Sequence, residues 1–177
     1  AISHLRSLGH RRIAFVSGPC GGRSAGERLD GYLSALDHEG LPHTDDWILP
    51  GAGLPEDGYA ALGRILRLES APTAVLCYND LTAIGLLSAT AQSGVRIPAD
   101  LSIVGYDNIA LSAFTTPRLT TIEQPKGAMG RTAVALCVSG IEGKPQPDRT
   151  LNPILVVRES TGPCRAAAGL LGRTQPE

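Results

Sequence analysis

Lysine is scarce in this chain: Lys126 and Lys144 are the only two, and the formal net charge at pH 7 is −1. Proteins that bind nucleic acid by themselves usually present clustered lysine and arginine side chains, which displace counterions from the phosphate backbone. The 16 lysine and arginine residues form no such stripe along this sequence. We therefore expect that these residues alone do not bind DNA.

Paired cysteines and long apolar runs are also absent. Cys20, Cys77, Cys137 and Cys164 are widely separated, form no C-x-x-C pair and have no histidine at ligand spacing. Because neither a zinc site nor a disulfide framework is indicated, we expect reduced thiols and no metal or other cofactor. No apolar run reaches the ~20 residues that span a bilayer, and the first six residues lack the apolar segment of a signal peptide. These absences favour a soluble, cytoplasmic protein without a membrane partner.

Helical and strand patterns alternate along the sequence, whose 177 residues suit one globular domain. The predicted strands are apolar runs without polar alternation, and the predicted helices carry apolar residues at helical spacing. This order is typical of an α/β fold whose doubly wound parallel sheet is covered on both faces. We predict strands at 13–16, 47–49, 73–77, 101–104, 119–122 and 154–158, and helices at 2–8, 24–40, 56–68, 80–93 and 125–141.

Polar residues follow four of the predicted strands. Ser24 and Arg28 come after the first strand, Asn79 after the third, Asp107 after the fourth and Gln124 after the fifth. In open parallel sheets, ligands bind beyond the carboxyl ends of the strands, so these side chains are expected to converge on one cleft. We predict them as ligand-binding residues.

Local structure offers another interpretation of the same positions. Ser24 can cap a helix, with Glu27 three residues later, and Asp80 can cap the helix that follows it. Asp107 suits an Asx-turn, and Arg28 could be a solvated charge on a helix. Spacing alone does not choose between these roles and ligand binding.

An enzyme remains a further alternative because residues 18–22 match G-x-C-x-G between a strand and a helix, the spacing of a nucleophile elbow. Such a turn would expose the thiol of Cys20 and would require a general base. The histidines do not follow the later strands, where that fold normally supplies the base. We therefore expect no catalytic residue and no enzyme, and keep a cysteine-dependent hydrolase as an alternative. The four histidines are His4, His10, His38 and His43.

Five sequence runs between residues 1 and 160 form a specific combination: HLRSLGHRRIAFVSGP, ERLDGYLSAL, PTAVLCYND, LSIVGYDNIALSAFTTPRLTTIEQP and LVVRES. Together they resemble the lac/gal repressor family of bacterial transcription regulators. The resemblance implies a periplasmic-binding-protein-like sensor that binds a small effector, such as a sugar or a nucleoside, between two lobes. Arg28 and Asp107 match the family's effector anchors, and Ser24 and Asn79 match supporting positions. A solute-binding protein of a transport system would share the fold and is a second alternative.

The resemblance also implies a domain layout. The family's DNA-binding headpiece and the first half of its sensor have no counterpart here, so we expect a fragment that reaches operator DNA only through the missing headpiece. We assign 1–122 to the C-terminal effector-binding subdomain, 123–149 to a returning strand and helix of an incomplete N-terminal subdomain, 150–161 to a return strand, and 162–177 to a disordered tail. The family's stacking aromatic has no counterpart in the loop at 51–55.

An apolar loop predicts the contact surface of a homodimer. Five of the six residues from Ile109 to Phe114 are apolar, which is more than a solvent-exposed turn requires. We predict that Ile109, Leu111 and Phe114, with the outward face of the 80–93 helix, form the dimer interface. Packing of this loop into the core is the alternative.

Overall fold

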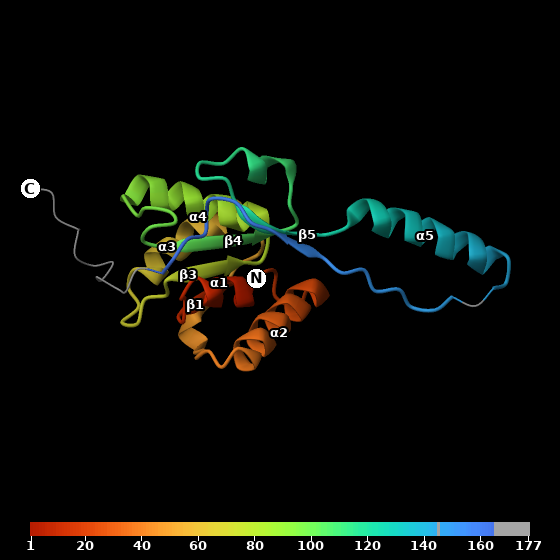
Figure 1. Cartoon of the computed structure of the whole chain (residues 1–177), viewed down its shortest axis with the longest axis horizontal. Helices are drawn as coiled ribbons and strands as arrows, with labels where there is room; N and C mark the ends of the chain where they lie inside the picture. The colour runs from red at the N-terminus through yellow and green to blue at the C-terminus, as the bar shows by residue number, and fades with distance from the viewer. Residues whose placement is uncertain (145, 165–177) are drawn as a thin grey trace, which may run out of the picture.

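A single six-stranded sheet forms the centre of the computed structural model, which describes residues 1–144 and 146–164 (Figure 1). The strand order is β2-β1-β3-β4-β5-β6, and the first five strands run parallel. The predicted α/β, doubly wound fold is confirmed. Strand bounds are β1 (Ile13–Val16), β2 (Ile48–Leu49), β3 (Ala74–Cys77), β4 (Ser102–Tyr106), β5 (Thr120–Glu123) and β6 (Ile154–Val156).

The last strand is the exception in this mostly parallel sheet, because β6 pairs antiparallel with β5. The helix after β5, α5 (Lys126–Ile141), extends beyond the carboxyl ends of the strands (Figure 1). The chain therefore returns to the sheet edge from that side and enters in the opposite direction, without the crossover that a parallel pair requires. A short apolar run carries no information about strand direction.

Two pairs of helices cover the two faces of the sheet (Figure 1). The helices α1 (Ile2–Ser7) and α2 (Arg23–His38) pack on one face, and α3 (Pro55–Ile65) and α4 (Asp80–Ser93) pack on the other. Successive residues of β1 point to opposite faces: the Phe15 ring stacks on Tyr32 of α2 at 5.1 Å, whereas Val16 joins the core beneath α3 and α4. Because helices bury both faces of the sheet, central strands such as β1 and β3 are apolar throughout and do not alternate between apolar and polar residues.

Two glycines allow α3 and α4 to pack closely. A Cβ atom on Gly58 would lie 1.8 Å from the backbone oxygen of Thr82, and one on Gly85 would lie 1.8 Å from that of Pro55. No side chain fits at these distances, so the helices touch through their backbones. This backbone contact fixes the position of α4 relative to α3. It therefore also fixes the loop after β3, which leads into α4.

The α5 helix contributes nothing to this core. None of its residues, all of which are described, is buried, and the side chains of Val134 and Ile141 are 64% and 87% exposed. No helix in the described part of the chain has both the length and the apolar character needed to cross a membrane.

Residues 162–164, the first part of the predicted tail, form hydrogen bonds with the segment before β1. The Gly162 carbonyl accepts a hydrogen bond from His10 Nε2 at 3.0 Å, and the Cys164 amide donates to the Leu8 carbonyl at 2.7 Å. These contacts tie the segment to the sheet end opposite α5, because Leu8 and His10 lie in the stretch that leads into β1. The rest of the predicted tail, 165–177, lies outside the described residues.

Candidate ligand-binding site

A cavity of about 400 Å³ opens beside the carboxyl ends of β1, β3, β4 and β5. Its polar lining comes from the first two turns of α2 and from the residues that directly end or follow strands. The lining includes three predicted ligand-binding residues, Ser24, Arg28 and Gln124, and, at the strand ends, the tyrosines Tyr78 and Tyr106. Parallel strands bring these segments, which are far apart in sequence, to one edge of the sheet.

Arg28 lies at the centre of the polar contacts. Its guanidinium donates to Asp107 Oδ1 at 3.1 Å and to the Tyr78 carbonyl, and it lies over the rings of Tyr78 and Tyr106, 4.5 Å and 3.8 Å from their centroids. Each cation–π contact contributes about 0.5–2 kcal/mol, depending on exposure. With only 17% of its side chain exposed, Arg28 is held in place and is not a solvated helix charge.

Asp107 presents a carboxylate with one oxygen engaged. Its Oδ1 accepts hydrogen bonds from Arg28 and from Gln124 Nε2, the latter at 2.6 Å, while no described residue donates to Oδ2. The residue has a φ of +106° and is followed by Asn108 at +47°, so the chain turns sharply after β4. Asp and Asn tolerate such angles better than other non-glycine residues. The turn thus brings three of the predicted residues into direct contact.

Ser24 does not cap α2, which corrects that interpretation. The helix begins at Arg23 with Gly22 as its N-cap, and Glu27 pairs with Arg23 at 2.8 Å. A turn closed by the Gly22 amide on the Pro19 carbonyl starts the helix early, so the Ser24 hydroxyl is available to contact the Tyr78 hydroxyl at 3.1 Å. Ser24 therefore joins the cluster through a tyrosine.

Asn79 lies apart from the other predicted site residues. Its Oδ1 accepts the Thr82 amide at 2.8 Å and caps α4, and its Nδ2 donates to the Gly53 carbonyl at 2.8 Å. Asn79, and not Asp80, is the cap of this helix. Both polar atoms of its amide group take part in holding two loops together, and a role in ligand binding stays a prediction.

The two tyrosines were missed by the sequence reasoning. Tyr78 directly follows β3 and precedes Asn79, and Tyr106 is the last residue of β4 and precedes Asp107. The argument that ligands bind beyond the carboxyl ends of the strands therefore applied to both tyrosines. The ring of Tyr78 packs closely on Gly18, because a Cβ atom there would lie only 2.5 Å from the ring. The ring also packs on Gly53, in the loop at 51–55 where the family's stacking aromatic is missing. The rings of Tyr78 and Tyr106 supply aromatic surface at the site from the ends of β3 and β4, and not from the loop at 51–55.

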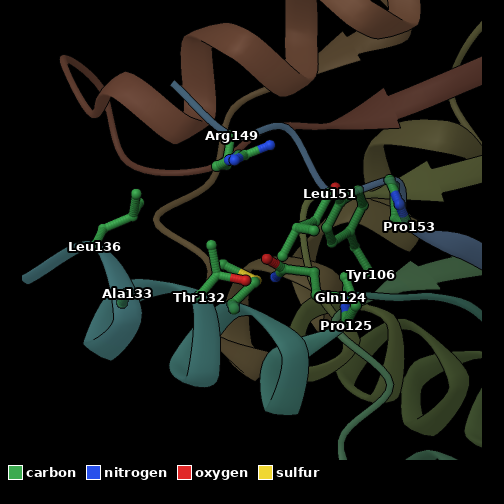
Figure 2. Close-up of a pocket in the computed structure, with 10 residues that line it drawn as sticks. Tyr106, Gln124, Pro125, Thr132, Ala133, Leu136, Arg149, Leu151 and Pro153 are labelled. Atoms are coloured by element: carbon green, nitrogen blue, oxygen red, sulfur yellow. The ribbon is translucent and has the colours of Figure 1, made fainter. Parts of the chain in front are cut away.

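A second cavity, of about 300 Å³, lies between α5 and the segment leading to β6 (Figure 2). Figure 2 shows Thr132 of α5 on one side and Arg149 with Leu151 on the other. Tyr106 and Gln124 line this cavity as well as the first. The two cavities therefore share part of their wall at the carboxyl ends of β4 and β5.

The cysteine turn has no recognisable base. Cys20 is exposed, and no hydrogen bond joins it to a histidine within the described residues. His4 and His10 contact Thr161 and Gly162, and His43 pairs with Asp37. The arrangement offers no observation in favour of nucleophilic catalysis.

The fold is that of a periplasmic-binding-protein-like domain. A family model described as a periplasmic binding protein-like domain matches residues 2–161, and the chain belongs to this family. Within it, the match is to the C-terminal effector-binding region of LacI-family transcription regulators, which confirms the resemblance carried by the sequence motifs.

Three relatives illustrate the match. The HTH-type transcriptional repressor PurR of Pasteurella multocida (strain Pm70) is 40% identical over 162 residues, covering 90% of this chain and 48% of the relative. A LacI-family regulatory protein from Chloroflexus aggregans is 36% identical with a TM-score of 0.85, covering 91% of this chain and 59% of that one. A LacI-family regulator from Enterococcus faecium with bound ribose is 36% identical with a TM-score of 0.84, covering 93% and 61%. The chain spans about half the length of the curated relatives it matches.

Proposed function

We propose that this chain is the effector-sensing and dimerisation part of a bacterial transcriptional repressor, which binds a small polar ligand of the sugar or nucleoside class. The observation that carries the proposal is the cluster of Arg28, Asp107 and Gln124 at the carboxyl end of the sheet. Because Oδ1 of Asp107 is occupied by the other two side chains, Oδ2 is the acceptor for a ligand hydroxyl or N–H group. A charge-assisted hydrogen bond of this kind contributes about 1.5–3 kcal/mol.

The two tyrosine rings suit the same ligand class. Tyr78 and Tyr106 add apolar ring surface to a polar cavity, which is the combination that a sugar ring or a nucleoside base requires. The E. faecium relative was solved with ribose, which supports a polyol among the candidates. We propose Ser24 and Asn79 as supporting residues.

Control of operator DNA would come from a headpiece outside this chain. Effector binding would close two lobes and shift the population towards the closed state, because the closed state binds the effector more tightly. A cytoplasmic location follows, since the regulator must reach the chromosome. The names of the relatives favour a regulator over a transport protein.

Calorimetry of the purified chain with D-ribose, D-glucose and adenosine tests the ligand class. We expect at least one of them to bind, and its 2-deoxy or 2′-deoxy analogue to bind at least about fivefold more weakly, because a missing hydroxyl leaves a buried polar group unpaired. Absence of heat with all three ligands, from a sample with folded circular dichroism, would reject this ligand class. Equal binding of the deoxy analogues would show that the hydroxyl is not what the carboxylate recognises.

We also propose a homodimer through the loop after β4. Leu111 and Phe114 are 52% and 81% exposed, and Leu81 on the outer face of α4 is 41% exposed. Phe114→Glu should convert a sedimenting dimer to monomer without unfolding it, because a carboxylate at an apolar interface loses its hydration. Ile141→Glu is the control, since Ile141 is equally exposed but lies on α5. If only Ile141→Glu dissociates the dimer, the interface lies on α5 and not on the loop after β4.

A further inference from the structure

The buried carboxylate of Asp80 holds the start of the loop after β4. Asp80 is fully buried at the first turn of α4, where its Oδ2 accepts the Ile109 amide at 2.8 Å and its Oδ1 accepts the Thr121 hydroxyl at 2.5 Å. Burial raises the pKa of this carboxyl, and the two hydrogen bonds oppose that shift. Gly105 of β4 leaves room for the group, since a Cβ there would lie 2.2 Å from Oδ1.

Arg158 holds the same loop from the other side. Just after β6, its guanidinium donates to Asn108 Oδ1 at 2.7 Å, to the Ser112 hydroxyl at 3.1 Å and to the Leu119 carbonyl at 2.6 Å. The planar guanidinium presents five N–H donors in a fixed fork, so it can bridge acceptors on three different residues. Asn108 has a left-handed backbone, so this contact holds the sharp part of the turn.

One short loop thus carries two functions of different kinds. Asp107 at its beginning belongs to the ligand cluster, and Leu111 and Phe114 at its tip belong to the exposed apolar surface. The residues that Asp80 and Arg158 hold, namely Asn108, Ile109 and Ser112, lie between Asp107 and Phe114.

We propose that Asp80 and Arg158 are positioning residues that couple the ligand site to the dimer surface by holding the 107–114 loop in a single conformation. The inference rests on the proposed function, and it adds that ligand affinity and dimer affinity share this support. If the loop loses its attachment to Asp80 or to Arg158, Asp107 no longer stays in contact with Arg28. Leu111 and Phe114 at the tip of the loop then lose their fixed conformation at the same time. Neither positioning residue needs to touch the ligand or the partner subunit.

Hydrogen exchange and sedimentation test the loop without any ligand. The variants are Arg158→Ala and Asn108→Gly; glycine keeps the left-handed backbone and removes only the amide acceptor. Arg118→Ala is the control, because its guanidinium pairs with Glu159 on the surface and contacts no residue of the 107–114 loop. We expect amide exchange across 107–114 to rise about tenfold or more in both variants, as for loss of one or more buried hydrogen bonds, and the dimer dissociation constant to rise with it.

The coupling itself is measured by a double-mutant cycle. With whichever of ribose, glucose or adenosine binds the wild type, Arg158→Ala and Asn108→Gly should each weaken binding, and the double variant should be no weaker than Arg158→Ala alone, because both remove the same attachment. Unchanged exchange in the loop would overturn the inference, as would faster exchange with an unchanged dimer. If none of the three ligands binds the wild type, the proposed ligand class fails, while exchange and sedimentation still decide the role of Arg158. Should Arg158→Ala fail to fold, Asn108→Gly decides alone.

Discussion

Replacing Asp107 with alanine should weaken effector binding about 5- to 150-fold, equivalent to about 1–3 kcal/mol. The carboxylate would supply the ligand's acceptor and also holds Arg28 and Gln124, so its loss removes one contact and loosens two others. Isothermal titration calorimetry with the ligand that binds the wild type is the measurement.

Two further variants make this result specific. Alanine is strained at a φ of +106°, whereas asparagine tolerates it, so Asp107→Asn separates the loss of charge from the strain of the turn. Asp30→Asn changes the same charge on the exposed face of α2 and should leave affinity unchanged. A loss of less than about twofold in both Asp107 variants, under about 0.5 kcal/mol, would remove Asp107 from the site.

Gly85→Ala should destabilise the protein by about 3 kcal/mol or more, because overpacking against backbone atoms forces a helix to move. The new methyl group would lie 1.8 Å from the Pro55 carbonyl oxygen. No side-chain rotation can relieve this clash, because the position of a Cβ atom and that of a carbonyl oxygen are both fixed by the backbone. The melting temperature should fall by about 6–12 °C for a domain of this size.

Gly26→Ala is the matched control for this prediction. Gly26 lies inside α2, and a Cβ there would meet nothing within 4 Å. This substitution should stabilise the helix by about 0.5–1 kcal/mol, the usual difference between alanine and glycine in a helix interior. Opposite signs for the two variants are expected, and a Gly85→Ala protein that melts with the wild type would show that α3 and α4 are not packed as tightly as the structure places them.

The amino-acid sequence by itself determined the layout of the fold and the place of the candidate site. Fully apolar runs marked the strands that are buried on two faces, and helical spacing with capping and breaking residues marked the helices between them. Once a parallel sheet follows from that order, residues after the strands must meet at one edge. Arg28, Asp107 and Gln124 could therefore be named before any contact was known, and the exposed apolar tip with Leu111 and Phe114 came from composition alone.

Only the tertiary structure decided which partner each polar atom has. Asn79 follows a strand as Asp107 does, yet it caps a helix and holds the Gly53 loop, while Tyr78 beside it contacts both Ser24 and Arg28. The direction of β6 and the roles of Asp80 and Arg158 likewise depend on segments that lie 29 to 50 residues apart in sequence. The physical reason is that hydrogen bonds act over about 3 Å, so the chain must be folded before their partners are defined.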